Sequence, residues 1–300
     1  MSKQISRLVL GTAQLGMDYG IANMTGQPDM KTVRDIVKTA WEGGIRQFDT
    51  AQGYGISEKV LGKAISDLGI SDQVKIISKL DPSIDHKNKE SVRKAIYKSL
   101  DCLRISCLHG LMIHKEEIID DFEDGVIENL NELADEGLIS YIGVSVYSPN
   151  RAHQIMQYDS IKLLQFPANI FDHRFQKCHI LDAAELNEKI LYIRSIFLQG
   201  LILINISEIP EQFKSARAVL EDLEIFSQQI GIDRKALAIG YIKYKYPKTF
   251  VIFGAETVRQ VKENIAIWKG LDFWNELILM IENRYFNVGD DVVNPLRWKQ

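Results

Sequence analysis

The sequence predicts an α/β protein built as a single (β/α)8 TIM barrel, and three observations support this fold class. Eight short apolar segments of β type recur along the 300 residues, and amphipathic helical patterns fill most of the intervals between them. Most of these segments are continuous rather than alternating, which is typical of parallel strands buried on both faces. Strands that alternate with helices imply right-handed crossovers, and eight such units close into a barrel.

The predicted strands are the apolar segments themselves. They span residues 8–10, 47–48, 74–80, 108–113, 141–146, 163–166, 190–197 and 250–253. Residues 201–206 are also apolar, and we interpret them as a loop packed on the barrel mouth rather than as a ninth strand.

The predicted helices carry apolar residues at the i, i+3, i+4 and i+7 spacing that places them on one face. They span about residues 33–41, 60–68, 89–103, 122–134, 149–157, 213–229, 234–246 and 256–269. We expect Asp29 and Ser57 to cap the first two, because a short polar side chain can accept a hydrogen bond from first-turn N–H groups.

The main alternative fold is a doubly wound open sheet. Such a sheet usually carries a G-x-G-x-x-G turn after its first strand when it binds a dinucleotide, and this sequence has none. No long Gly/Ser/Pro linker divides the chain. We therefore expect one barrel domain over residues 1–300, with an irregular C-terminal tail from about residue 285.

The composition is that of an ordinary globular protein, with 46% apolar and 25% charged residues. Lysine and arginine number 36 against 40 acidic residues, so we expect no nucleic-acid partner. The three cysteines lie at irregular spacing, which predicts neither a disulfide framework nor a metal site. No apolar segment is long enough to span a membrane, and the first residues lack the apolar core of a signal peptide. We expect a cytoplasmic protein without membrane contact, and the oligomeric state stays open.

Four reactive side chains accompany three consecutive predicted strands. They are Asp49 at the end of the second strand, Tyr54 in the loop after it, Lys79 near the end of the third strand and His114 after the fourth. Because the carboxyl ends of barrel strands meet at one mouth, we expect these side chains to converge. Each one alone is more often a cap, a structural residue or a solvated strand end, so the prediction depends on their combination.

This combination suits the reduction of a carbonyl group, which gains an oxyanion and needs a proton donor. A tyrosine hydroxyl has an ordinary pKa of ~10 and is a reluctant donor at neutral pH. We expect the ammonium of Lys79 to lower the pKa of Tyr54, and Asp49 to keep that ammonium charged and in place. A neutral His114 could hydrogen-bond the same carbonyl oxygen.

Residues 48–58, FDTAQGYGISE, resemble the Asp-Thr-Ala…Tyr-Gly-x-Ser-Glu signature of the aldo-keto reductase family. The order of Asp49, Tyr54, Lys79 and His114 is similar to the catalytic tetrad of that family. Shorter similarities at residues 10–12, 143–145 and 252–255 extend the resemblance over nearly the whole chain.

The resemblance implies a nicotinamide cofactor, NADP or NAD, bound in extended form without a Rossmann fold. The positions that it assigns to cofactor binding are Gly11, Thr12, Asp49, Ser145, Gln165, Arg194, Ser195, Leu198, Gly254, Glu263 and Asn264. Arg194 stands where many family members stack a tyrosine on the nicotinamide. Arg259 is the only cation within residues 254–260, where Glu256 would repel a 2′-phosphate, so we expect weak discrimination between NADPH and NADH.

The expected function is therefore an NAD(P)-dependent oxidoreductase that transfers hydride between the nicotinamide and a small-molecule carbonyl or alcohol. Residues 15–23 should lie at the barrel mouth, and their resemblance to members linked to bacterial surface-sugar pathways implies a sugar or other polyhydroxy substrate. Two alternatives stay open: a non-catalytic regulatory subunit that binds the cofactor, and a sugar epimerase that holds its cofactor tightly.

Overall fold

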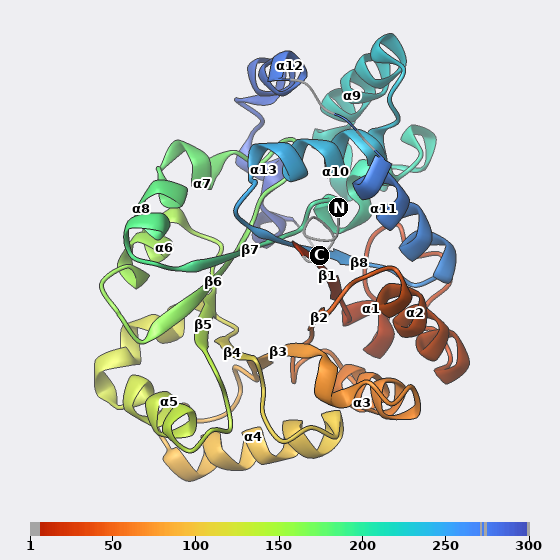
Figure 1. Ribbon diagram of the computed structural model, residues 1–300. Coiled ribbons are helices and arrows are strands. Elements are labelled where there is room, and N and C mark those ends of the chain that lie inside the picture. The colour runs from red at the N-terminus through yellow and green to blue at the C-terminus, as the bar shows by residue number, and fades with distance from the viewer. Residues whose placement is uncertain (1–6, 271, 273–274, 299–300) are drawn as a thin grey trace.

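The computed structural model describes residues 7–270, 272 and 275–298, and Figure 1 shows a ring of strands surrounded by helices. The strands are all parallel and pair in chain order, and β1 also pairs with β8, so the sheet closes into a barrel. The strands are β1 (Leu8–Gly11), β2 (Gln47–Asp49), β3 (Lys75–Leu80), β4 (Gly110–Ile113), β5 (Ile142–Ser145), β6 (Ile161–Pro167), β7 (Ile190–Arg194) and β8 (Phe250–Gly254). The predicted barrel is confirmed.

Helices follow the strands and form the outer layer (Figure 1). The α-helices are α1 (Ala13–Gly16), α2 (Met30–Glu42), α3 (Ser57–Asp67), α4 (Lys89–Leu103), α5 (Val126–Asp135), α6 (Pro149–Ile155), α7 (Arg174–Lys177), α8 (Ile180–Leu186), α9 (Arg217–Ile230), α10 (Arg234–Lys245), α11 (Val258–Gly270), α12 (Asn275–Tyr285) and α13 (Asp290–Val293). Short 3-10 helices are η2 (Ser71–Gln73), η3 (Glu116–Asp124), η4 (Leu198–Leu203), η5 (Ile206–Glu208), η6 (Glu211–Ala216) and η7 (Pro295–Arg297). Within these described residues, no helix is both long enough and apolar enough to cross a bilayer.

Three local predictions differ from the structure or are refined by it. Strand β7 ends at Arg194 instead of residue 197, because Ser195 has a left-handed backbone with φ of 61°. Most of the apolar segment at 201–206 lies in η4 and η5, so it is not a strand. Beyond residue 285 the described chain forms α13 and η7, and residues 299–300 of the expected tail lie outside the described residues.

The two expected helix caps behave differently. The carboxylate of Asp29 accepts a hydrogen bond from the backbone N–H of Thr32 at 2.8 Å, which confirms this cap. The prediction for Ser57 is wrong, because its Oγ donates to the carbonyl oxygen of Thr12 at 2.8 Å and lies 3.0 Å from the hydroxyl of Thr50. Ser57 therefore joins the first two loops of the barrel mouth.

A layer of inward-facing residues fills the centre of the barrel. Val9, Ile77, Met112, Leu163, Tyr192 and Ile252 form a cluster separate from the larger core between strands and helices. Because side chains alternate along a strand, the residue two positions further faces inward again, nearer the mouth. These next residues are Gly11, Lys79, His114, Gln165, Arg194 and Gly254. The same alternation that packs the barrel interior thus directs the predicted site residues to one end.

Candidate active site

A cavity of about 620 Å³ opens at the carboxyl ends of the strands. The predicted site residues that line it are Gly11, Thr12, Asp49, Tyr54, His114, Ser145, Gln165, Arg194, Ser195, Gly254, Glu263 and Asn264. Two predicted residues are not part of its wall. Lys79 is 1% exposed and contacts Asp49, and Leu198 is fully buried in the hydrophobic core.

A chain of buried hydrogen bonds crosses the base of the cavity. Lys79 Nζ donates to Asp49 Oδ1 at 2.6 Å and to the carbonyl oxygen of Thr50 at 3.0 Å. The second carboxylate oxygen of Asp49 accepts from Gln165 Nε2 at 2.8 Å, and Gln165 Oε1 accepts from Ser145 Oγ at 3.2 Å. These bonds fix four side chains from β2, β3, β5 and β6 relative to one another.

Tyr54 and His114 stand next to each other above this chain. Their rings are perpendicular, with centroids 5.5 Å apart, and the ammonium of Lys79 lies 5.1 Å from the centroid of the Tyr54 ring. Burial, together with the nearby charges of Lys79 and Arg194, lowers the pKa of His114 to about 3. His114 is therefore neutral at physiological pH, which suits a hydrogen bond to a carbonyl oxygen.

The pKa of Tyr54 departs from the sequence-based expectation. Burial raises this pKa above its ordinary value, the charge of Asp49 raises it further, and the charge of Arg194 opposes the increase. Lys79 was expected to lower it, but in this geometry the ammonium is hydrogen-bonded to Asp49 and Thr50. Burial dominates because the phenolate would lose its hydration. Tyr54 is thus held in the protonated form.

Close packing around the Tyr54 loop explains why particular residue types occur in and next to this signature. A Cβ on Gly16 would lie 2.1 Å from the carbonyl oxygen of Tyr54, and Gly55 has φ of 58°. The carboxylate of Glu58 is buried and accepts hydrogen bonds from Ser78 at 2.6 Å and Ser99 at 3.1 Å. The glycines, Ser57 and Glu58 therefore position the loop that carries Tyr54.

The opposite end of the cavity is lined by charged residues from two helices. Glu263 on α11 pairs with Lys235 at the start of α10, at 2.7 Å, and with Arg259, at 3.3 Å. Beside them Arg234 pairs with Glu224 on α9, at 2.9 Å. The sequence analysis missed Lys235 and Arg234, because they precede α11 by more than twenty residues and no local motif marks them.

The cavity can hold an extended cofactor with polar groups at both ends. At one end the side chains of Ser145 and Gln165 offer a hydroxyl and an amide. At the other end Asn264 is 3% exposed, and its Oδ1 has no hydrogen-bond partner among the described residues. Between them a Cβ on Gly254 would lie 2.3 Å from the end of the Gln14 side chain, so a larger residue there would require Gln14 to move. An unpartnered buried amide is what a polar ligand group would satisfy.

Two further parts of the wall come from loops. Residues 15–23 were expected at the mouth, and Tyr19, Gly20, Ala22 and Asn23 indeed line the cavity. Tyr147, which follows β5, was not foreseen, and its ring stacks on the Arg194 guanidinium at 3.9 Å. Its position next to the Gly-Val-Ser segment was the only sequence signal.

Comparison with known proteins agrees with this geometry. Residues 7–280 match the Aldo/keto reductase family. The chain belongs to this family. Such reductases are NAD(P)-dependent oxidoreductases, and the chain is accordingly an enzyme of this class.

Individual relatives of this aldo-keto reductase are distant. Aldo-keto reductase YhdN of Bacillus subtilis is 29% identical over 209 residues, and the match covers 66% of this chain and 60% of that protein. The NADH-specific methylglyoxal reductase of Escherichia coli is 25% identical over 295 residues, covering 87% of this chain and 89% of that protein. The holo form of aldo-keto reductase AKR11C1 from Bacillus halodurans superposes with a TM-score of 0.77 at 21% identity, over 97% of this chain and 95% of that one. This last similarity shows the fold.

Proposed function

We propose that this aldo-keto reductase reduces a polar carbonyl substrate, with Tyr54 as proton donor and His114 as the group that orients the carbonyl. The observation that carries the proposal is the adjacency of a protonated Tyr54 and a neutral His114 above the buried Lys79–Asp49 pair. Asp49 and Lys79 act together: burial lowers the pKa of Lys79, and the charge and hydrogen bond of the Asp49 carboxylate oppose this shift.

The residues at both ends of the cavity fit NAD or NADP. Ser145 and Gln165 would hold the amide of the nicotinamide, Gly254 and Ser195 the middle of the molecule, and Asn264 the adenine. The bound cofactor would supply hydride exchange with the carbonyl carbon, for which no protein side chain is suited. Leu198 has a buried side chain, so any contribution from this position would come from its backbone.

Proton transfer is then the task of Tyr54. An alkoxide formed from the carbonyl is a stronger base than a phenolate, so Tyr54 can protonate it even though burial raises the pKa of the phenol. The phenolate that remains lies near the Lys79 ammonium, which stabilises the negative charge at that stage. General acid catalysis of this kind contributes ~10²–10⁴-fold in rate.

We also propose that NADH is used at a useful rate. Glu263 already pairs with both Lys235 and Arg259, two cations at the segment after β8. A 2′-phosphate would have to compete with this carboxylate for both partners, whereas the 2′-hydroxyl of NADH would not. The NADH-specific relative from Escherichia coli is consistent with such a preference.

The substrate end of the cavity favours a polyhydroxy compound such as a sugar. Its wall carries the hydroxyls and amides of Tyr19, Asn23, Tyr147 and Gln199, which can pair with several substrate hydroxyls. Three free cysteines in the described chain are consistent with our proposal of a reducing, cytoplasmic compartment.

The test is steady-state oxidation of NADH and NADPH with a panel of aldehydes, ketones and open-chain sugars. We expect turnover with polar aldehydes and its near abolition in Tyr54→Phe. A purified protein that binds cofactor but turns over no carbonyl compound would favour the regulatory-subunit alternative. Cofactor that co-purifies and is never consumed would favour the epimerase alternative.

A further inference from the structure

Four cationic side chains line the cavity in the described part of the chain, and three of them face a carboxylate. Arg234 pairs with Glu224, and Lys235 and Arg259 pair with Glu263. Arg194 differs from them: its hydrogen-bond partners are Ser145 Oγ at 3.3 Å, Ser195 Oγ at 3.3 Å and the carbonyl oxygen of Val146 at 3.2 Å, all of them uncharged.

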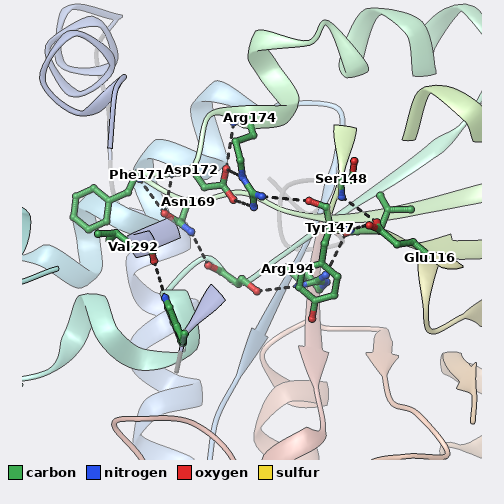
Figure 2. A network of polar contacts seen from close by, with 12 residues as sticks. Glu116, Tyr147, Ser148, Asn169, Phe171, Asp172, Arg174, Arg194 and Val292 are labelled. Atoms are coloured by element: carbon green, nitrogen blue, oxygen red, sulfur yellow. Dashed lines mark hydrogen bonds and ion pairs between the residues drawn. The ribbon is translucent and has the colours of Figure 1, made fainter. Parts of the chain in front are cut away.

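The guanidinium of Arg194 is held rigidly. One face stacks on the Tyr147 ring at 3.9 Å, and three of its five N–H groups are engaged by the hydroxyls and carbonyl named above. The Tyr147 backbone is fixed in turn, because its N–H donates to Glu116 at 2.6 Å and its carbonyl oxygen accepts from Arg174 at 3.3 Å (Figure 2). Arg174 is itself paired with the fully buried carboxylate of Asp172.

Arg194 adds a positive charge to the cavity end that holds Tyr54. Asp49 and Lys79 form an ion pair there, and the pKa of His114 is about 3, so His114 adds no charge at neutral pH. The charge of Arg194 is close enough to oppose the pKa increase of Tyr54 and to lower the pKa of His114. A preorganised cation without a protein counter-charge is suited to an anionic ligand group.

We infer that Arg194 binds a carboxylate of the substrate, so that the enzyme prefers carbonyl compounds that also carry an acid group. This inference rests on the proposed function and names the substrate class. Among the described residues, two N–H groups of Arg194 have no protein partner, and a guanidinium can bind one carboxylate through two N–H groups. The other three cations that line the described part of the cavity each face a carboxylate, whereas the hydrogen-bond partners of Arg194 are uncharged.

The test compares 4-formylbenzoate with its uncharged methyl ester, which is one methyl group larger. We expect the wild type to show a kcat/KM about 30-fold higher for the carboxylate, which corresponds to about 2 kcal/mol. In Arg194→Gln this ratio should fall to about 1. Any effect of the variant on cofactor binding cancels in the ratio. Arg194→Lys keeps the charge and should give an intermediate ratio, and a ratio as low as that of the glutamine variant would contradict recognition by charge.

Arg151→Gln is the matched control, because Arg151 pairs with Asp120 outside the cavity. Its activity and its ratio of kcat/KM for the two aldehydes should equal those of the wild type. A wild-type ratio near 1, or a ratio that persists in Arg194→Gln, would overturn the inference. The inference would also be overturned if Arg194→Gln lowered kcat/KM equally for both aldehydes and weakened NADH binding, because Arg194 would then bind the cofactor. A preference for 4-formylphenyl phosphate over 4-formylbenzoate would overturn the assignment to a carboxylate.

A binding measurement separates this inference from the proposed function. Calorimetric titration with 4-(hydroxymethyl)benzoate in the presence of NADH, a pair that cannot react, needs no turnover. We expect binding to the wild type and an affinity about 30-fold lower for Arg194→Gln. The wild type could bind this ligand more tightly than Arg194→Gln does and yet reduce neither aldehyde. That result would support the inference and contradict the proposed reaction. Equal binding to both proteins would overturn the inference whatever the activity.

Discussion

Replacing Lys79 by methionine would leave the Asp49 carboxylate buried with Gln165 as its remaining side-chain partner. The two charged groups are 2.6 Å apart, and their side chains are only 1% and 5% exposed. Because the pair is so deeply buried, water replaces the lost ammonium only in part, from the cavity that Asp49 borders. Methionine has a similar length, so the substitution removes the charge without opening a large cavity.

The expected cost follows from this burial. Removing one partner of a buried ion pair destabilises a protein by about 3–5 kcal/mol, because the other charge stays buried without compensation. The carbonyl oxygen of Thr50 also loses its hydrogen bond from Lys79, which adds up to ~1 kcal/mol. We expect Lys79→Met to lower the free energy of unfolding by about 4 kcal/mol, or the melting temperature by about 6 °C for a chain of this length.

The assay is urea unfolding at pH 7 of the wild type, Lys79→Met, Asp49→Asn and the double variant. The double variant buries no unpaired charge, so it should be less destabilised than the sum of the single variants by about 2 kcal/mol or more. Lys63→Met is the control, because its pair with Asp67 is 46% and 34% exposed and should contribute less than about 1 kcal/mol. If the losses in unfolding free energy of the two single variants add up to that of the double variant within about 0.5 kcal/mol, the coupling between Lys79 and Asp49 is refuted.

Three further predictions concern the reaction and the cofactor. Tyr54→Phe should lower kcat for carbonyl reduction by ~10²–10⁴-fold with the cofactor Kd nearly unchanged, and near-normal turnover would exclude Tyr54 as the proton donor. The pKa of His114 is about 3 when folded and near 6.5 when unfolded, so its contribution to stability is lost as the pH falls below about 6.5. Burial also lowers the pKa of His109, to about 4, so urea unfolding should show a loss between pH 7.5 and 5 that is about 2 kcal/mol smaller in His114→Gln than in the wild type. Glu263→Gln frees Lys235 and Arg259, so fluorescence titration should show the NADPH-to-NADH affinity ratio rising about tenfold, and an unchanged ratio would place the 2′-phosphate elsewhere.

Local periodicity predicted the barrel because strand and helix patterns repeat over distances of a few residues. Continuous apolar segments indicated buried parallel strands, and the period of two along them places Lys79, Gln165 and Arg194 on the inward face beyond Ile77, Leu163 and Tyr192. The convergence of Asp49, Tyr54, Lys79 and His114 followed from their positions at consecutive strand ends, and the structure brings them together.

Charge states and the partners of individual side chains were beyond the reach of the sequence. The pKa of Tyr54 depends on how deeply the ring is buried, and burial outweighs the charges that were considered in advance. Lys235 neutralises Glu263 only because the start of α10 packs beside α11. Ser57 joins the loops of β1 and β2 instead of capping α3.

The amino-acid sequence by itself determined the barrel, the family and the catalytic candidates, since each of these depends on short-range pattern or on a contiguous signature. Only the tertiary structure decided which cations of the cavity face a carboxylate and that, among the described residues, Arg194 beside Tyr54 has uncharged hydrogen-bond partners. The physical reason is that electrostatic energies depend on distances of a few ångströms and on exclusion of water. Both arise from the packing of segments that are far apart in the chain.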